Sequence, residues 1–178
     1  MTPWYIATKR YSPADAEHWA SYIAWSGLTQ LEEVVSLDSM LCPSVLKDIE
    51  DDDWPHLVTE HFRTQFFVDF PYLMQRVEGI VSKNVLCVFC DPPAPPVAPA
   101  VAPLTFLGYD LVDREGDASA LTNCGGFPEA FSNAELSPLG LLTDYDRAVE
   151  IQERLYDRYP DERHADCHLW AIFRLMTS

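Results

Sequence analysis

The hydrophobic residues of this chain fall into short β-prone runs and longer helical patterns that follow one another along the sequence. Four runs predict strands, at residues 4–11, 84–91, 104–113 and 168–175. The second run, 84–91, is apolar on both faces, which is typical of an interior strand. The run at 168–175 shows the same two-sided pattern, so we expect both runs to lie inside a sheet.

Three stretches carry helix signals. Ser12 and Pro13 suit a cap and a first helical position, apolar residues follow at helical spacing, and Gly27 suits the end. Residues 69–81 begin with Asp-Phe-Pro and continue with apolar side chains at the same spacing. Residues 144–159 form the longest such pattern and follow a capping-box-like start.

Other segments carry weaker patterns. The turn at 114–117, with Gly116 for a positive φ, predicts a hairpin in which 118–124 returns beside 104–113 as a strand. Residues 33–38 fit a short strand, with a helix as the rival. A short helix is expected within 43–53, which ends in an acidic run.

Two further segments remain ambiguous at this level. Residues 58–67 carry aromatic side chains at both helical and strand spacings. Residues 127–142 look irregular, because prolines and a glycine interrupt them, and they offer a short helix at 128–131.

The segment 92–103 is rich in proline and alanine and cannot join the middle of a sheet, because proline lacks a backbone donor. We expect an exposed loop that connects two neighbouring antiparallel strands. The sequence therefore predicts a single α+β domain spanning residues 1–178, with a mainly antiparallel sheet of about five strands packed by three main helices.

Charge narrows the function classes. The chain has 12 basic and 28 acidic residues among 178, a formal net charge of −16. Nucleic acids and anionic membranes are bound through clusters of Lys and Arg, which this sequence does not show, so neither is an expected partner. The apolar runs are too short to span a membrane, and no secretory pattern is visible at the start. We expect a cytoplasmic protein.

The five cysteines are an odd number, which fits free thiols in a reducing compartment. Cys87 and Cys90 form a CxxC pair, but residues three apart in a strand point to opposite faces, so a shared redox or zinc site is disfavoured. No cofactor and no metal site is assigned.

The residues with the best claim to chemistry lie in the second half. Cys124 precedes a Gly-Gly turn, whose backbone amides suit anion binding, so Asn123, Gly125 and Gly126 are candidate ligand-binding residues. A thiol nucleophile needs a base, because its ordinary pKa is about 8.5. The catalytic candidates are Cys124, with His164 or His168 as the base and Asp166 to orient it. The alternative interpretation is a buried cysteine before a tight turn.

Two functional hypotheses follow from these observations. The first is a non-catalytic protein-binding module, comparable as a class with immunity or regulatory proteins, whose acidic surface binds a basic partner protein. The second is a small enzyme or ligand-binding protein that uses the Cys124 and His164–His168 site. The sequence does not decide between catalysis and binding.

Overall fold

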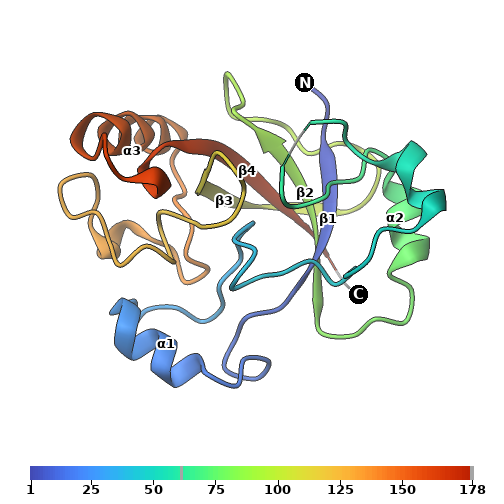
Figure 1. Ribbon diagram of the computed structural model, residues 1–178, viewed down its shortest axis with the longest axis horizontal. Helices are drawn as coiled ribbons and strands as arrows, with labels where there is room; N and C mark the ends of the chain where they lie inside the picture. Colours follow the sequence, from blue (N-terminus) through green and yellow to red (C-terminus); the bar gives the residue numbers. More distant parts are fainter. Residues whose placement is uncertain (61, 177–178) are drawn as a thin grey trace.

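The computed structural model describes residues 1–60 and 62–176, and it shows an α+β fold built on a four-stranded antiparallel sheet (Figure 1). The strands, which run in the order β1-β2-β4-β3 across the sheet, are β1 (Trp4–Lys9), β2 (Lys83–Cys90), β3 (Leu104–Asp113) and β4 (Cys167–Leu175). The helices are α1 (Trp19–Ser26), α2 (Phe70–Arg76) and α3 (Tyr145–Arg158), with short 3₁₀ turns η1 (Asp51–His56), η2 (Asn133–Glu135) and η3 (Arg163–Ala165). Among the described residues, no helix has the length and apolar character needed to cross a membrane.

Strand β4 lies between β2 and β3, so strands from both sides of the proline-rich segment share one sheet. This confirms the interior position expected for 168–175 and for 84–91. The expectation that 92–103 connects two neighbouring strands is wrong, because β4 lies between β2 and β3. The prediction of a single domain over 1–178 stays a prediction.

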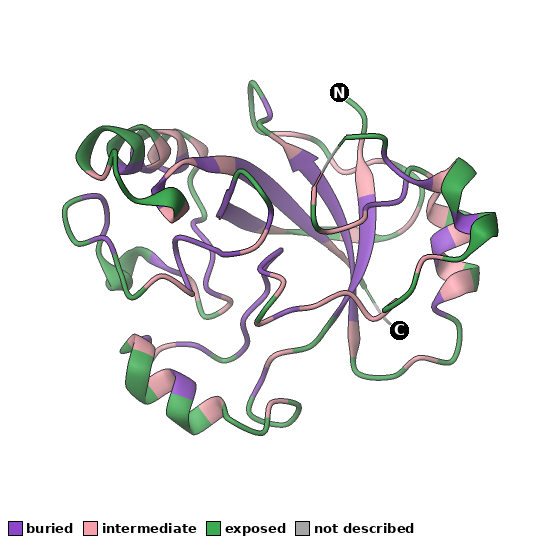
Figure 2. Ribbon diagram, viewed as in Figure 1, coloured by how far each residue is buried: buried purple, intermediate pink, exposed green. Residues whose placement is uncertain are grey.

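The two faces of the sheet are covered differently. One face packs with side chains of α2 and α3, including Leu73, Ile151 and Leu155, around the odd-numbered positions of β4. The other face packs with irregular segments, which contribute Val35 and Phe66 around Trp170 and Ile172, among others. Figure 2 shows the strands as the most continuously buried elements, whereas α1 is mostly exposed.

The sheet has four strands rather than about five, because residues 118–124 do not form the return strand of a hairpin. Only an isolated bridge joins Ser119 to Val112. The Ser119 hydroxyl accepts hydrogen bonds from the backbone of Leu121 and Thr122, and the Ser119 carbonyl accepts one from Asn123. These local hydrogen bonds fold the segment into turns, because they engage backbone groups that a strand would use for its ladder of hydrogen bonds.

Several helices differ from the expected bounds. Helix α1 begins at Trp19 and not at Pro13, because the Ser12 hydroxyl donates to the Asp15 carboxylate and the intervening residues form turns. Helix α2 ends at Arg76 instead of continuing to residue 81, although Asp69 caps it as expected, accepting from the Tyr72 amide. Gly27 ends α1 with a φ of 70°, in agreement with the sequence.

The weaker segment predictions had mixed outcomes. Residues 33–38 form neither a strand nor a helix, but an extended stretch with one bridge from Val34 to Tyr11. The helical turn expected within 43–53 lies later, at η1. Residues 128–130 form a turn rather than the short helix expected over 128–131. The described part of 58–67 is irregular, and its isolated bridges, to Tyr5 and Leu57, both involve Phe67; residue 61 lies outside the described residues.

The strongest local prediction, the helix over 144–159, is confirmed by α3. The Asp144 carboxylate accepts from the Arg147 amide at 2.7 Å and caps the first turn. The buried side chains of α3 recur at helical spacing, namely Ala148, Ile151 and Leu155. The helix packs on β3 and β4, next to the end of the sheet where the predicted site residues lie.

A test of the β3 packing uses Gly108, whose φ of 147° is open almost only to glycine. A Cβ atom there would lie 2.5 Å from the carbonyl oxygen of Leu142, which pairs with Tyr109. We expect Gly108→Ala to lower the free energy of unfolding by about 3 kcal/mol, measured by urea denaturation.

Gly79→Ala is the matched control, because Gly79 also has a positive φ, 76°, but nothing lies within 4 Å of the added atom. Only the backbone strain, about 1 kcal/mol, is expected there. Equal losses for the two variants would contradict the close packing of β3 against residue 142.

Candidate functional site

The predicted site loop is held by a buried carboxylate in β3. Asp110 is fully buried and accepts hydrogen bonds from the hydroxyls of Ser36, at 2.5 Å, and Ser119, at 2.6 Å. The backbone amides of Leu37 and Leu111 donate to it as well. Burial raises the pKa of Asp110 to about 6, although the hydrogen bonds from Ser119, Ser36 and the Leu37 amide favour the charged form.

A second buried carboxylate, Asp38, extends this network. One of its oxygens accepts from the amides of Met40 and Leu41, each at 2.8 Å. The other accepts from the Ser119 amide and from the side-chain amide of Asn123, each at 2.9 Å. Asn123 therefore ties the candidate loop to the segment 38–41, and its amide nitrogen is already engaged.

Cys124 is half-buried in this loop, and its thiol donates to the carbonyl of Ser119 at 3.2 Å. Burial, together with the nearby carboxylates of Asp38 and Asp113, raises the pKa of Cys124 to about 12. The thiol is therefore protonated at neutral pH. Gly125 and Gly126 follow it as exposed residues with positive φ, at the surface of the turn.

His164 lies in η3, and its Nδ1 atom is 2.7 Å from the carboxylate of Asp113, the last residue of β3. Asp113 is buried, whereas the His164 ring is partly exposed. The residue that orients His164 is thus Asp113, which the sequence analysis did not select. Asp166 instead accepts from the Nε of Arg114 at 2.8 Å.

His168 belongs to a separate group, which we call the polar corner: Cys90, Asp91, Arg114, Asp166 and His168. The Nδ1 atom of His168 lies 2.5 Å from the Asp91 carboxylate and 2.9 Å from the guanidinium of Arg114. Asp91 adopts a left-handed φ of 45°, and both its backbone and its carboxylate bond to Leu169.

The donor atoms of Cys90, Asp91 and His168 all lie within 4.8 Å of one another, and such a set of sulfur, oxygen and nitrogen is chemically suited to a transition metal. The arrangement in this structure is nevertheless an ion-pair network, because the positive guanidinium of Arg114 contacts the same His168 nitrogen. A cation at that position would be repelled by it.

The structure thus divides the predicted site residues. Cys124 and Asn123 share the network of the buried carboxylates, His164 pairs with Asp113, and His168 and Asp166 belong to the polar corner. The described hydrogen bonds do not join the Cys124 thiol to either imidazole. Sequence reasoning missed Asp91, Asp113 and Arg114, whose partners lie 51 to 77 residues away in the chain.

A different candidate surface surrounds η1, and we call it the acidic face: Asp48, Glu50, Asp51, Asp52 and Trp54. All five are exposed, and the Trp54 side chain is 63% exposed. A groove of about 650 Å³ begins at Trp54 and is lined further by Phe62 and Glu60. An exposed tryptophan among carboxylates is a composition found where proteins bind other proteins.

The acidic face is held in place by Asp53, which points inward. Its carboxylate accepts from Arg76 at 2.7 Å, from the Tyr72 hydroxyl at 2.8 Å and from the Glu50 amide at 2.8 Å. The bond from Arg76 is the main cause that lowers the pKa of Asp53, to about 2. The carboxylates of Asp51 and Asp52 beside it face solvent, whereas the Glu50 carboxylate lies 3.4 Å from Arg76.

No known protein family, curated protein or solved structure matches this chain.

The network around Asp110 makes a pH prediction. Because its pKa in the folded chain, about 6, lies above its ordinary value of 3.8, the folded state holds the proton more readily. This contribution to stability is present at low pH and is lost as the pH rises through 6. From about pH 4 to about pH 7, the unfolding free energy of the wild type should fall by about 2–3 kcal/mol relative to Asp110→Asn.

Denaturant titrations at each pH measure this difference. Asp53→Asn serves as the control, because Asp53 titrates near pH 2 and its contribution is constant between about pH 5 and pH 7. If the difference in unfolding free energy between the wild type and Asp110→Asn did not change between about pH 4 and about pH 7, the raised pKa of Asp110 would be contradicted.

The Cys124 geometry makes a prediction about reactivity. Since its thiol is protonated and bonded to a carbonyl, we expect alkylation by iodoacetamide at neutral pH to be slower than in the denatured chain. Mass spectrometry of the digested protein gives the rate for each cysteine. Fast labelling of Cys124 that His164→Gln abolishes would instead support the nucleophile hypothesis.

Proposed function

We propose that this protein is a non-catalytic protein-binding module whose acidic face engages a basic partner protein. The observation that carries the proposal is the exposure of Trp54 among Asp51 and Asp52, on a 3₁₀ turn anchored by the buried Asp53. Tryptophan is among the residues that most often dominate binding energy, and the surrounding carboxylates attract a basic surface.

The anchoring of η1 also favours binding. Asp53 receives bonds from Arg76 and Tyr72 of α2, and the Glu50 and Asp53 side chains each cap the other's backbone. The turn therefore keeps its shape before a partner arrives, so less conformational entropy is lost on binding. The net charge of −16 adds a long-range attraction that salt weakens.

The alternative, a small enzyme or ligand-binding protein that uses Cys124, His164, Asp166 and His168, has weaker support. The pairing of His164 with the buried Asp113 is what a general base requires. Against it stand the burial of the Cys124 thiol, which raises its pKa and keeps it protonated, and the bond of the thiol to the Ser119 carbonyl.

A capture experiment tests the proposal. The immobilised chain is incubated with lysate of its native cell at low ionic strength and eluted with salt, and the eluted protein is identified and purified. We expect a basic protein whose affinity falls as salt rises. Trp54→Ala should weaken its binding by roughly 30-fold, the effect of a typical hot spot, in surface plasmon resonance.

Trp25→Ala is the matched control, because Trp25 is similarly exposed, at 57%, but lies on α1, away from the acidic face. Asp51→Asn with Asp52→Asn should mainly slow association. Equal affinities for the two tryptophan variants, or recovery of no basic protein, would count against the proposal.

A further inference from the structure

A second pocket, at the far end of the sheet from the polar corner, has the opposite electrostatic character to the rest of the surface. It encloses about 520 Å³, within the range of small-molecule sites, where β2 and β4 approach α2. Its lining includes three basic residues, Arg10, Lys83 and Arg174, and no acidic one. In a chain with 12 basic residues against 28 acidic ones, this gathering of bases sets the pocket apart.

The guanidinium groups are positioned by one buried acid behind the lining. Glu33 accepts from Nε and Nη2 of Arg10, each at 3.0 Å, and from Nη1 of Arg174, also at 3.0 Å. Asn84 donates to the same carboxylate at 2.8 Å. Burial would raise the pKa of Glu33, but these bonds and the two positive charges outweigh it and lower the pKa.

Glu33 balances only one of the three positive charges. The bonds among the described residues use Nε and Nη2 of Arg10 and Nη1 of Arg174, which leaves further N–H groups on each guanidinium for a ligand. The Lys83 ammonium contacts the carbonyl of Ile80, a neutral partner. Lys9 stands directly opposite Lys83 in the strand register, a like-charge pair that is unfavourable without a nearby anion.

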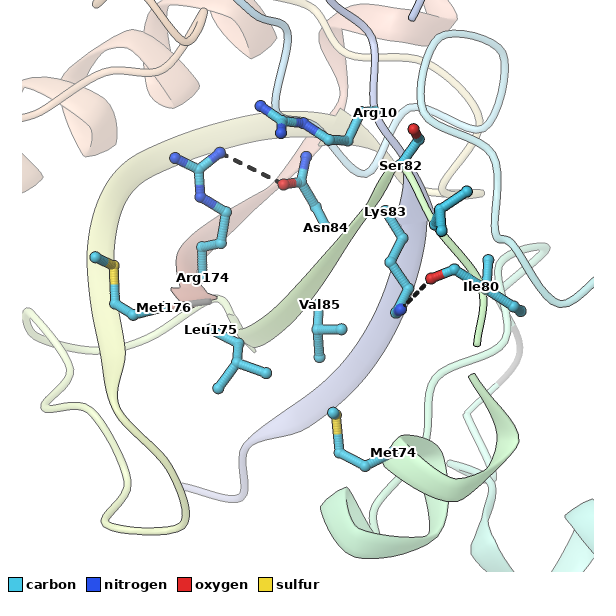
Figure 3. A pocket seen from close by; sticks show the side chains of 11 residues that line it. Arg10, Met74, Ile80, Ser82, Lys83, Asn84, Val85, Arg174, Leu175 and Met176 are labelled. Carbon is cyan, nitrogen blue, oxygen red and sulfur yellow. Dashed lines mark hydrogen bonds between the residues drawn. The ribbon is translucent and has the colours of Figure 1, made fainter. Parts of the chain in front are cut away.

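The rest of the pocket is apolar. Figure 3 shows the guanidinium groups of Arg10 and Arg174 near the Asn84 amide, whereas the Lys83 side chain runs toward the Ile80 carbonyl. The side chains of Val85, Leu175 and Met74 lie further along the pocket. These apolar lining residues come from α2, the following loop, β2 and the end of β4, and they are Met74, Ile80, Val85, Leu175 and Met176. The pocket therefore combines a fork of positive charge with a surface suited to hydrocarbon.

We propose that this pocket binds a small anion that carries an apolar tail, with the anionic head at the guanidinium groups of Arg10 and Arg174. Arginine forks match the oxygens of carboxylates and phosphates. The tail lies along Val85 and Met74, where its burial adds affinity. The site is independent of the proposed protein-binding function, since the acidic face and this pocket share no residue.

Isothermal titration calorimetry with decanoate, below its critical micelle concentration, tests the site. We expect saturable binding at one site per chain, and much weaker binding of decanol, which has the same tail without the charge. A parallel titration with decyl phosphate distinguishes a carboxylate head from a phosphate head. Comparable binding of decanol and decanoate, or no saturable binding of either anion, would overturn the proposal.

Variants locate the site. Arg10→Met removes one of the two guanidinium groups and should weaken decanoate binding roughly tenfold, the loss expected for a charge-assisted hydrogen bond. Lys47→Met is the matched control, because it removes the same charge at an exposed position outside this pocket, and it should bind as the wild type does. Met74→Glu places a negative charge on the apolar wall and should abolish binding.

Thermal unfolding of each variant verifies that it is folded. If Arg10→Met and Lys47→Met lose affinity equally, the anion is held by general charge and the pocket assignment fails. If Met74→Glu binds like the wild type, the tail does not lie along this wall and the proposal also fails.

Discussion

Two buried carboxylates, Asp110 and Asp38, are the constraint on which the irregular half of this fold depends. A buried charge is tolerable only when its oxygens receive enough hydrogen bonds. Here the donors come from the segments around Ser36 and Ser119 and from the side chain of Asn123, which are distant in sequence. These segments curl around the two carboxylates rather than extending the sheet. The absence of a strand over 118–124, the course of 36–41 and the position of the Cys124 loop share this cause.

The parts of the fold that the sequence predicted are those whose structural signals lie within one short stretch of chain. Helix α3 carries its cap and its apolar stripe within one stretch, and β2, β3 and β4 are visible as apolar runs. What sequence reasoning could not predict depends on partners far away in the chain. Asp91 and Asp113 appear in the sequence as strand ends, and only the tertiary fold sets them beside His168 and His164. The candidate site was therefore predicted as one group of residues, whereas the structure divides it.

The charges of the chain are segregated by a few ion pairs. Asp53 takes up Arg76, and Glu33 takes up parts of Arg10 and Arg174. Around η1 the ion pair with Asp53 occupies Arg76 and leaves the carboxylates of Asp51 and Asp52 exposed. At the end of β2, Glu33 is shared between Arg10 and Arg174, so the guanidinium charges exceed the charge of that carboxylate. Two surfaces of opposite character thus arise in one acidic protein, and each is fixed in place by a buried carboxylate. A protein partner and a small anion are the respective ligands that such surfaces favour.

The central place of β4 has a consequence for how the chain acquires its structure. Strands β2 and β3 are synthesised well before β4, which must later insert between them. Until then, the edges of both earlier strands expose unpaired amide and carbonyl groups, and pairing so remote in sequence is slow to form. A nascent chain halted before residue 167 would expose two unpaired strand edges, with which other polypeptides could pair. We expect newly made chains to depend on protection by chaperones during that interval.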